Sequence, residues 1–344
     1  MTSQHNVPSN VSGSIPPSAS IAEPTITSST QPSVSNGPHT VAYGMVMDPA
    51  SEKVPVGAVE ISMKHAFLNK TLTFISQCSR ASCSCLFVQF NGRIERYSWS
   101  DIVSLLHSVY GTITRSNPTI TSVVYFTPMR PSFFADSHIQ TLFYDDEVPE
   151  FLSGIFEGRS KLSMPPLVLR KLTFPVDSES LNEFHSATKD GSLFSQQHVF
   201  VGGTFDRLHN GHRLLLQSAA YATCGKLTVG VTSDDIITHK SNSHLIQSFE
   251  QRYASVHAFL LDVASNIVFE VRELLDSAGP ALLAPEGLLV VTDDTLENGN
   301  KINERRKERG LKPLEIAVID TLSIPDGRTL SSSMLRESDS TSVD

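Results

Sequence analysis

The sequence lacks the features that mark membrane, secreted and nucleic-acid-binding proteins. None of its apolar runs is long enough to span a membrane, and its N-terminus lacks the basic start and apolar core of a signal peptide. No Lys or Arg precedes Lys53, which argues against a mitochondrial transit peptide. The net charge is −9 and no block of basic residues occurs, so nucleic acid is a poor candidate partner. We therefore expect a cytoplasmic protein that binds neither membranes nor nucleic acid.

Cysteine is also scarce, and its spacing does not favour a metal site. Cys78, Cys83 and Cys85 form a C-x4-C-x-C cluster, and Cys224 stands alone. Structural zinc sites use paired C-x2-C spacings, and no downstream partner at zinc-finger spacing completes this cluster. We therefore expect thiols beside a buried strand in a reducing compartment, and no metal bound by the protein itself.

The composition divides the chain into two tails, two folded segments and a linker. Residues 1–40 are rich in Ser, Thr, Pro and Asn and carry almost no charge, so they cannot bury enough surface to offset their ordering entropy. We expect them to be disordered. Residues 41–175 have a globular composition, residues 176–197 form a polar linker, residues 198–337 form a second domain, and residues 338–344 form a short disordered tail.

The first folded segment, residues 41–175, is predicted to be a smaller α/β domain. Apolar runs at residues 86–90 and 123–126 predict strands, and apolar residues at helical spacing predict a helix over residues 99–110. His107 lies among the apolar residues of that helix, which favours a partly buried structural role. No motif in this segment can be tied to chemistry, so an accessory role and an assembly role both remain open.

Strands and helices alternate through the second domain, residues 198–337. Apolar runs predict strands at residues 198–204, 226–232, 267–271, 288–292 and 314–319. Helical patterns follow at residues 210–223, 247–263, 296–309 and 329–337. This alternation predicts a doubly wound parallel sheet, an α/β architecture that binds its ligands at the carboxyl ends of the strands. Thr204, Thr232 and Thr292 fall at such ends.

The most informative stretch, residues 199–216, joins the first of these strands to the first helix. Gly202 and Gly203 follow an apolar run and allow the backbone to approach a bulky charged group. Residues 209–212 read H-N-G-H and open the helix, which places two histidines one turn apart at its N-terminus. Unpaired N–H groups and the positive end of the helix dipole favour a phosphate at this point.

Two motifs in the second domain resemble signatures of one enzyme superfamily. Residues 201–212, which end in H-N-G-H, resemble the first signature of the nucleotidyltransferases that carry an H-x-G-H motif. Residues 330–336 read L-S-S-S-M-L-R and resemble the second signature of that superfamily, I-S-S-T-x-x-R. The resemblance implies a Rossmann-like nucleotidyltransferase fold for this domain.

A third stretch narrows the resemblance to one family. Residues 292–313 read TDDTLENGNKINERRKERGLKP and resemble a region of eukaryotic and archaeal phosphopantetheine adenylyltransferases, with Asp294 in place of the more usual Glu. The same branch includes the adenylyltransferase domain of coenzyme A synthase. The resemblance implies transfer of AMP from ATP, with Mg²⁺, to 4′-phosphopantetheine, giving dephospho-coenzyme A and pyrophosphate. No G-x4-G-K-[ST] loop occurs, so we expect dephospho-coenzyme A kinase to be a separate protein.

The resemblance also implies roles for particular residues. His212, with His209 beside it, would stabilise charge on the α- and β-phosphates. Lys240 would neutralise the acceptor phosphate, and Thr204 would hydrogen-bond a phosphate oxygen. Further contacts with the nucleotide are expected from Gly203, Thr204, Phe205, Asn303, Arg306, Ser331, Ser332, Ser333 and Arg336.

Other interpretations remain open. A cytidylyltransferase or a nicotinamide mononucleotide adenylyltransferase would share the H-x-G-H motif. However, the first usually carries R-T-x-G-I-S-T-S, and the second does not share the pattern of residues 295–313. A non-catalytic scaffold for a coenzyme A synthesis complex is a further alternative, although a pseudoenzyme would be free to lose its histidines. Lys240 could also be a solvated loop residue, Asp206 could cap a turn, and Arg252 could pair with Glu250 or another carboxylate.

Overall fold

The computed structural model describes two α/β domains. The described residues are 56–62, 69–80, 85–91, 94–126, 139–144, 152–171, 196–238, 243–264 and 266–341. All of them fall within one compact unit, residues 45–344. The tail predicted at residues 1–40 and most of the linker predicted at residues 176–197 lie outside the described residues.

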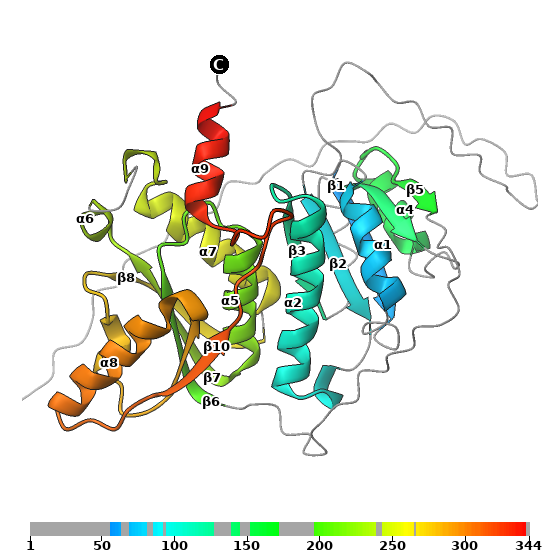
Figure 1. Ribbon diagram of the computed structural model, residues 1–344. Helices are drawn as coiled ribbons and strands as arrows, with labels where there is room; N and C mark the ends of the chain where they lie inside the picture. The colour runs from blue at the N-terminus through cyan, green and yellow to red at the C-terminus, as the bar shows by residue number, and fades with distance from the viewer. Residues whose placement is uncertain are drawn as a thin grey trace, which may run out of the picture. The chain divides into compact units, whose positions relative to one another are not determined.

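The first domain is built on a parallel five-stranded sheet with the strand order β3-β2-β1-β4-β5 (Figure 1). Its strands are β1 (Val56–Ser62), β2 (Cys85–Asn91), β3 (Thr121–Tyr125), β4 (Ile139–Tyr144) and β5 (Val168–Lys171). Its helices are α1 (Asn69–Arg80), α2 (Trp99–Ser116) and α4 (Leu152–Lys161). β3 therefore forms one edge of this sheet.

The sequence predicts this domain only in part. β2, β3 and α2 lie where two strands and a helix are expected, and α2 begins where Ser98 and Asp101 form a reciprocal capping box. The other elements are not anticipated because their local signals are weak. β5 spans only four residues, and α4 contains two glycines, which lower its helix propensity.

The second domain holds another parallel five-stranded sheet, with the order β10-β9-β6-β7-β8. Its strands are β6 (Gln196–Gly203), β7 (Thr223–Thr232), β8 (Val268–Leu274), β9 (Leu288–Thr292) and β10 (Glu315–Ile319). Each strand lies within a few residues of a predicted one. The predicted α/β architecture is confirmed. The prediction succeeds because buried apolar runs such as β9 are a strong signal for strands in the interior of a parallel sheet.

The helices of the second domain are α5 (Asn210–Tyr221), the short α6 (Asp234–Ile237), α7 (Phe249–Val263), α8 (Leu296–Glu308) and α9 (Ser332–Thr341). The last differs from its prediction. Thr329 pairs with Ser323 in an antiparallel bridge, so the helix starts later and continues into the tail expected to be disordered. Among the described helices, none is long and apolar enough to cross a membrane.

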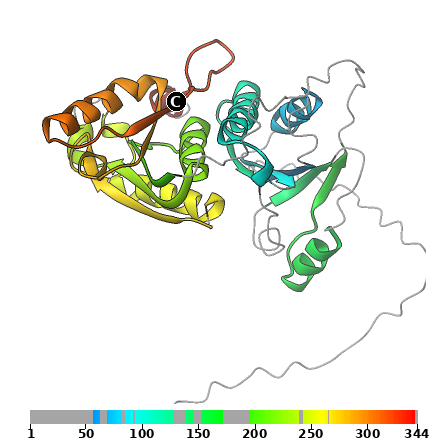
Figure 2. The same cartoon turned by 90° about the horizontal axis from the view of Figure 1, so that it is seen from below.

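The two domains meet where α2 packs against α5 (Figures 1 and 2). Val109 of α2 and Leu215 of α5 belong to one cluster of buried apolar residues, which also includes residues from strands of both sheets. Trp99 Nε1 also donates a hydrogen bond to the backbone oxygen of Ser218, at 2.9 Å. The first domain therefore shares a hydrophobic core with the helix that carries the H-x-G-H motif.

Candidate active site

The turn between β6 and α5 has an unusual backbone. Phe205 and Arg207 adopt left-handed conformations, with φ angles of 54° and 48°, although neither residue is glycine. Such conformations cost about 1–2 kcal/mol each and persist only where surrounding contacts enforce them. The Phe205 ring is fully buried, and a Cβ on Gly203 would lie only 3.1 Å from it. Glycine at position 203 therefore gives the ring its place in the turn.

Asp206 lies between these two residues and holds the turn. Its buried carboxylate accepts hydrogen bonds from Gln247 N at 3.0 Å and from Arg336 at 2.6 Å. Its backbone carbonyl accepts a third from Ser332 Oγ at 2.8 Å. One residue thus connects the strand-to-helix turn, the segment before α7 and the start of α9. The sequence predicts only a possible turn cap here, because a partner 130 residues away leaves no local signal.

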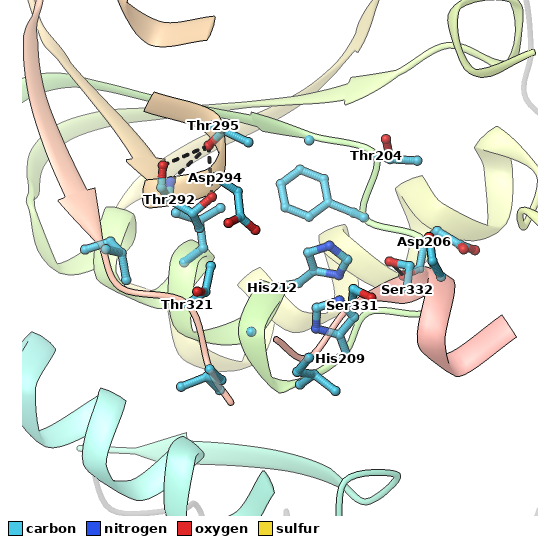
Figure 3. A pocket seen from close by; sticks show the side chains of 18 of the residues that line it. Thr204, Asp206, His209, His212, Thr292, Asp294, Thr295, Thr321, Ser331 and Ser332 are labelled. Atoms are coloured by element: carbon cyan, nitrogen blue, oxygen red, sulfur yellow. Dashed lines mark hydrogen bonds between the residues drawn. The ribbon is translucent and has the colours of Figure 1, made fainter. Parts of the chain in front are cut away.

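His209 and His212 stack face to face beside this turn (Figure 3). Their ring centroids are 3.8 Å apart, and the ring planes differ by 19°. Burial lowers the pKa of His209 to about 4, although the charge of Asp206 opposes the shift. His209 is therefore neutral at pH 7, and its ring places no positive charge beside His212.

The first turn of α5 is suited to an anion. His209 occupies the N-cap position but makes no side-chain capping bond, so it does not consume the N–H groups of that turn. These N–H groups and the helix dipole face the same end of the helix as the histidine rings. The two histidines lie at the N-terminus of α5, where the sequence places them, and their contact with phosphate stays a prediction.

The start of α9 forms a second wall of the site. Ser331 and Ser332 line the cavity (Figure 3), and so do Ser333 and Arg336. Arg336 donates to Ser333 Oγ at 2.8 Å as well as to Asp206. These two bonds use two of the five N–H groups of the arginine. The structure therefore brings the second signature motif to the histidines of the first.

Together these segments enclose a cavity of about 300 Å³ at the carboxyl ends of β6, β9 and β10. That volume and position are typical of ligand sites in parallel α/β sheets. The remaining wall comes from the ends of β9 and β10 and comprises Thr292, Asp294, Thr295, Ile319, Asp320, Thr321 and Leu322. The hydroxyls of Thr292 and Thr295 bond to each other at 2.9 Å, which fixes the turn after β9 (Figure 3).

A buried arginine holds Thr204 at the rim of this cavity. Arg252 is fully buried and donates to the backbone oxygens of Thr204 (2.9 Å), which follows β6, and Thr232 (2.8 Å), which ends β7. Its guanidinium also pairs with Asp234, so the carboxylate partner is this residue rather than Glu250. Arg252 therefore fixes two strand ends relative to each other at the site.

Asn303 and Arg306, which are predicted to contact the nucleotide, are not among the residues that line this cavity. Arg306 is fully buried and donates to the backbone oxygens of Lys312 (2.6 Å) and Ala281 (2.6 Å). Asn303 bonds the backbone N–H and carbonyl of Leu314, at 2.8 and 2.9 Å. Both side chains hold the segment that leads from α8 into β10. These bonds give both residues a structural role, and their contact with the nucleotide stays a prediction.

Two further predictions concern Lys240 and metals. Lys240 lies outside the described residues, so its contact with the acceptor phosphate stays a prediction. Cys78, Cys85 and Cys224 carry thiols and form no disulfide. The described part of the chain holds no group of three or more His, Cys, Asp or Glu that could bind a metal ion.

Comparison with known proteins matches residues 200–338 to a family model described as cytidylyltransferase-like. Over 139 residues, the chain is 38% identical to a phosphopantetheine adenylyltransferase of Methanopyrus kandleri, a match that covers 40% of this chain and 87% of that protein. Over 146 residues, it is 32% identical to the phosphopantetheine adenylyltransferase of Saccharomyces cerevisiae, covering 42% and 47%. An uncharacterized protein of Schizosaccharomyces pombe is 28% identical over 206 residues, covering 60% and 64%.

The fold, the two signature motifs and these matches define the second domain as a nucleotidyltransferase domain. Within that class, the chain belongs to the phosphopantetheine adenylyltransferase family. The match spans about half the length of the yeast relative. The match to the S. pombe protein is longer than the nucleotidyltransferase domain, so it also includes residues before position 200.

Proposed function

We propose that the chain transfers AMP from ATP to 4′-phosphopantetheine, giving dephospho-coenzyme A and pyrophosphate. The observation that carries this proposal is the convergence of two distant motifs on one cavity. The stacked His209 and His212 line it together with Ser331 and Ser332 (Figure 3). The names of the archaeal and yeast relatives support the choice of substrates.

This reaction suits a site without a strong general base. The phosphate of 4′-phosphopantetheine is already anionic, so one of its oxygens can attack the α-phosphorus of ATP directly. A new P–O bond forms while the bond from the α-phosphorus to the bridging oxygen breaks, and pyrophosphate leaves with the electron pair. Catalysis then depends on holding the reactants in line and on stabilising the charge that develops.

The residues around the cavity can supply both effects. His212, at the first turn of α5, would donate a hydrogen bond to an oxygen of the α-phosphate as negative charge builds. Thr204, held by Arg252, would bond a phosphate oxygen at the end of β6. Arg336, held by Asp206, would present its remaining N–H groups to the pyrophosphate that leaves.

Mg²⁺ enters this proposal as part of the Mg–ATP substrate. Asp294 and Asp320 line the cavity, and Mg²⁺ takes one or two carboxylates in addition to phosphate oxygens. The carboxylate of Asp206 is not counted among them, because Arg336 and Gln247 already occupy it. Bound with ATP, the ion would offset phosphate charge.

The test is pyrophosphate release by the purified full chain with Mg–ATP and one acceptor at a time. The acceptors are 4′-phosphopantetheine, phosphocholine and nicotinamide mononucleotide, and each reaction is repeated with CTP. We expect release with ATP and 4′-phosphopantetheine. Release with another pair would instead identify a cytidylyltransferase or a nicotinamide mononucleotide adenylyltransferase, and no release with any pair would favour the scaffold. A separate dephospho-coenzyme A kinase and a cytoplasmic location stay predictions.

A further inference from the structure

Asn210, the variable residue of the H-x-G-H motif, is directed at the first domain. It is 1% exposed, and it is not among the residues that line the cavity. Its Oδ1 accepts hydrogen bonds from the backbone N–H (3.1 Å) and the hydroxyl (2.8 Å) of Ser122. Its Nδ2 donates to Ile120 O at 3.2 Å and to Thr114 Oγ1 at 3.3 Å. All four bonds cross from the second domain to the first.

The orientation of this amide is fixed by its partners. The backbone N–H of Ser122 can only donate, and the carbonyl of Ile120 can only accept. Oδ1 must therefore face Ser122 and Nδ2 must face Ile120. With both donors and two acceptor positions used, the Asn210 side chain has no unsatisfied group and one allowed position.

Gln217, two turns further along α5, makes an equivalent contact. Its Nε2 donates to Val124 O at 2.6 Å, and its Oε1 accepts from Tyr110 Oη at 2.9 Å. Ser122 and Val124 lie two residues apart on β3, an edge strand whose outward polar groups would otherwise lack partners. The amides of α5 thus take the place of a neighbouring strand along this edge.

We propose that Asn210 and Ser122 are positioning residues for nucleotidyl transfer. The edge of the first sheet sets the position of the start of α5, and so it sets the positions of His209 and His212. This inference rests on the proposed function. It gives the first domain a role in the reaction that neither its sequence nor the family match assigns.

The positions of these residues explain why loss of the Asn210 bonds would lower the rate of the reaction. Asn210 directly follows His209 and stands two residues before His212, so a shift of its Cα moves both stacked rings. Misplacement of a catalytic group by about 1 Å can cost about a hundredfold in rate. The first domain also contacts the wall of the cavity that Thr321 lines, because His107 Nε2 of α2 lies 3.4 Å from the backbone oxygen of Thr321.

The experiment compares Asn210→Ala with Gln217→Ala in the full chain. Both changes remove a buried amide that joins α5 to β3, so both lower the melting temperature. Only the first lies beside the histidines. Below the melting temperatures, we expect Asn210→Ala to lower kcat about 10- to 100-fold with little change in the KM for ATP. We expect Gln217→Ala to keep kcat within about twofold of the parent.

Ser122→Ala provides a milder second variant. It removes the hydroxyl bond but keeps the bond from the backbone N–H, so we expect a smaller loss of kcat in a protein that folds. An unchanged kcat in both Asn210→Ala and Ser122→Ala would overturn the proposal. An equal loss of kcat in Gln217→Ala would do so too, because it would show a general effect of stability.

A second readout separates this inference from the proposed reaction. The imidazole Hε1 signals of His209 and His212, assigned by His209→Gln and His212→Gln, report the ring stack by NMR without any substrate. We expect Asn210→Ala to shift both signals and Gln217→Ala to leave them in place. If the parent makes no dephospho-coenzyme A but the signals behave in this way, the proposed function fails while the positioning role stands. Unshifted signals in Asn210→Ala would refute the positioning role.

Discussion

Asp206 takes no part in the proposed chemistry, yet its carboxylate holds both Arg336 and the backbone of Gln247. The side chains of Asp206 and Arg336 are 1% and 6% exposed. Removing one partner of such a pair leaves a buried charge, which typically costs about 3–5 kcal/mol.

The sequence predicts the residues that would touch substrate, because the motifs are local. It does not predict Asp206 as a connector, since its partners come from segments far along the chain.

At the same scale, His212→Ala tests the assignment of the phosphate-binding histidine. If His212 donates to charge that develops in the transition state, its removal should lower kcat about 10²- to 10³-fold. The melting temperature should change little by comparison, since the ring lies at the cavity. Steady-state kinetics and thermal unfolding of parent and variant provide the check. Parental turnover in His212→Ala would mean that the reaction takes place elsewhere.

The lowered pKa of His209 makes the stability of the folded chain depend on pH. Its pKa is lowered from 6.5 to about 4 in the folded chain, so between these values the unfolded chain binds a proton that the folded chain does not. The contribution of His209 to stability is therefore complete above pH 6.5 and declines toward pH 4, by up to about 1.4 kcal/mol per pH unit. Melting temperatures from pH 7.5 to 4.5 should fall less steeply for His209→Gln. Equal slopes would show that the pKa of His209 is not lowered in the folded protein.

At the scale of elements, prediction succeeds where patterning is strong and local. The buried strands of the second sheet, such as β7 and β9, read as apolar runs, and they alternate with helices along the chain. The charged helix α8 shows the limit of such patterning, because the resemblance implies only a nucleotide contact for Arg306. Arg306 is instead fully buried, because its donors fit the carbonyls of the turn before β10. Such a fit depends on tertiary geometry and leaves no pattern in the sequence.

Arg306→Lys tests that structural role. A lysine ammonium cannot reach the carbonyls of Lys312 and Ala281 together, and each buried carbonyl left unpaired costs about 1–3 kcal/mol. The variant should have a lower melting temperature and an unchanged KM for ATP. The exposed Arg309→Lys serves as the control and should stay within about 0.5 kcal/mol of the parent. A raised KM for ATP at an unchanged melting temperature would restore the nucleotide contact.

At the scale of the whole molecule, the two described domains share one cluster of buried apolar residues and the buried amides of α5. The composition of the first domain predicts an α/β fold but no function. Its relation to the site depends on Ser122 and Val124, whose bonds to α5 join residues about 90 positions apart. Pairing across that distance is set by the fold and cannot be deduced from spacing.

This shared core predicts a single unfolding transition. Trp99 is the sole tryptophan of the chain, and its Nε1 bonds to Ser218 of α5, so its fluorescence reports the contact between the domains. If the domains unfold together, tryptophan fluorescence and far-ultraviolet circular dichroism should give the same midpoint in urea. A fluorescence transition at lower urea would show that the domains separate first, and it would weaken the case for a rigid α5.

The most direct test of the proposed function is to identify the products by mass spectrometry when the full chain acts on Mg–ATP and 4′-phosphopantetheine. We expect dephospho-coenzyme A and pyrophosphate in equal amounts, and a loss of both with His212→Ala. Formation of ADP in place of pyrophosphate would show phosphoryl rather than adenylyl transfer. That result, or the absence of any product, would contradict the function proposed for the cavity between His212 and Ser331.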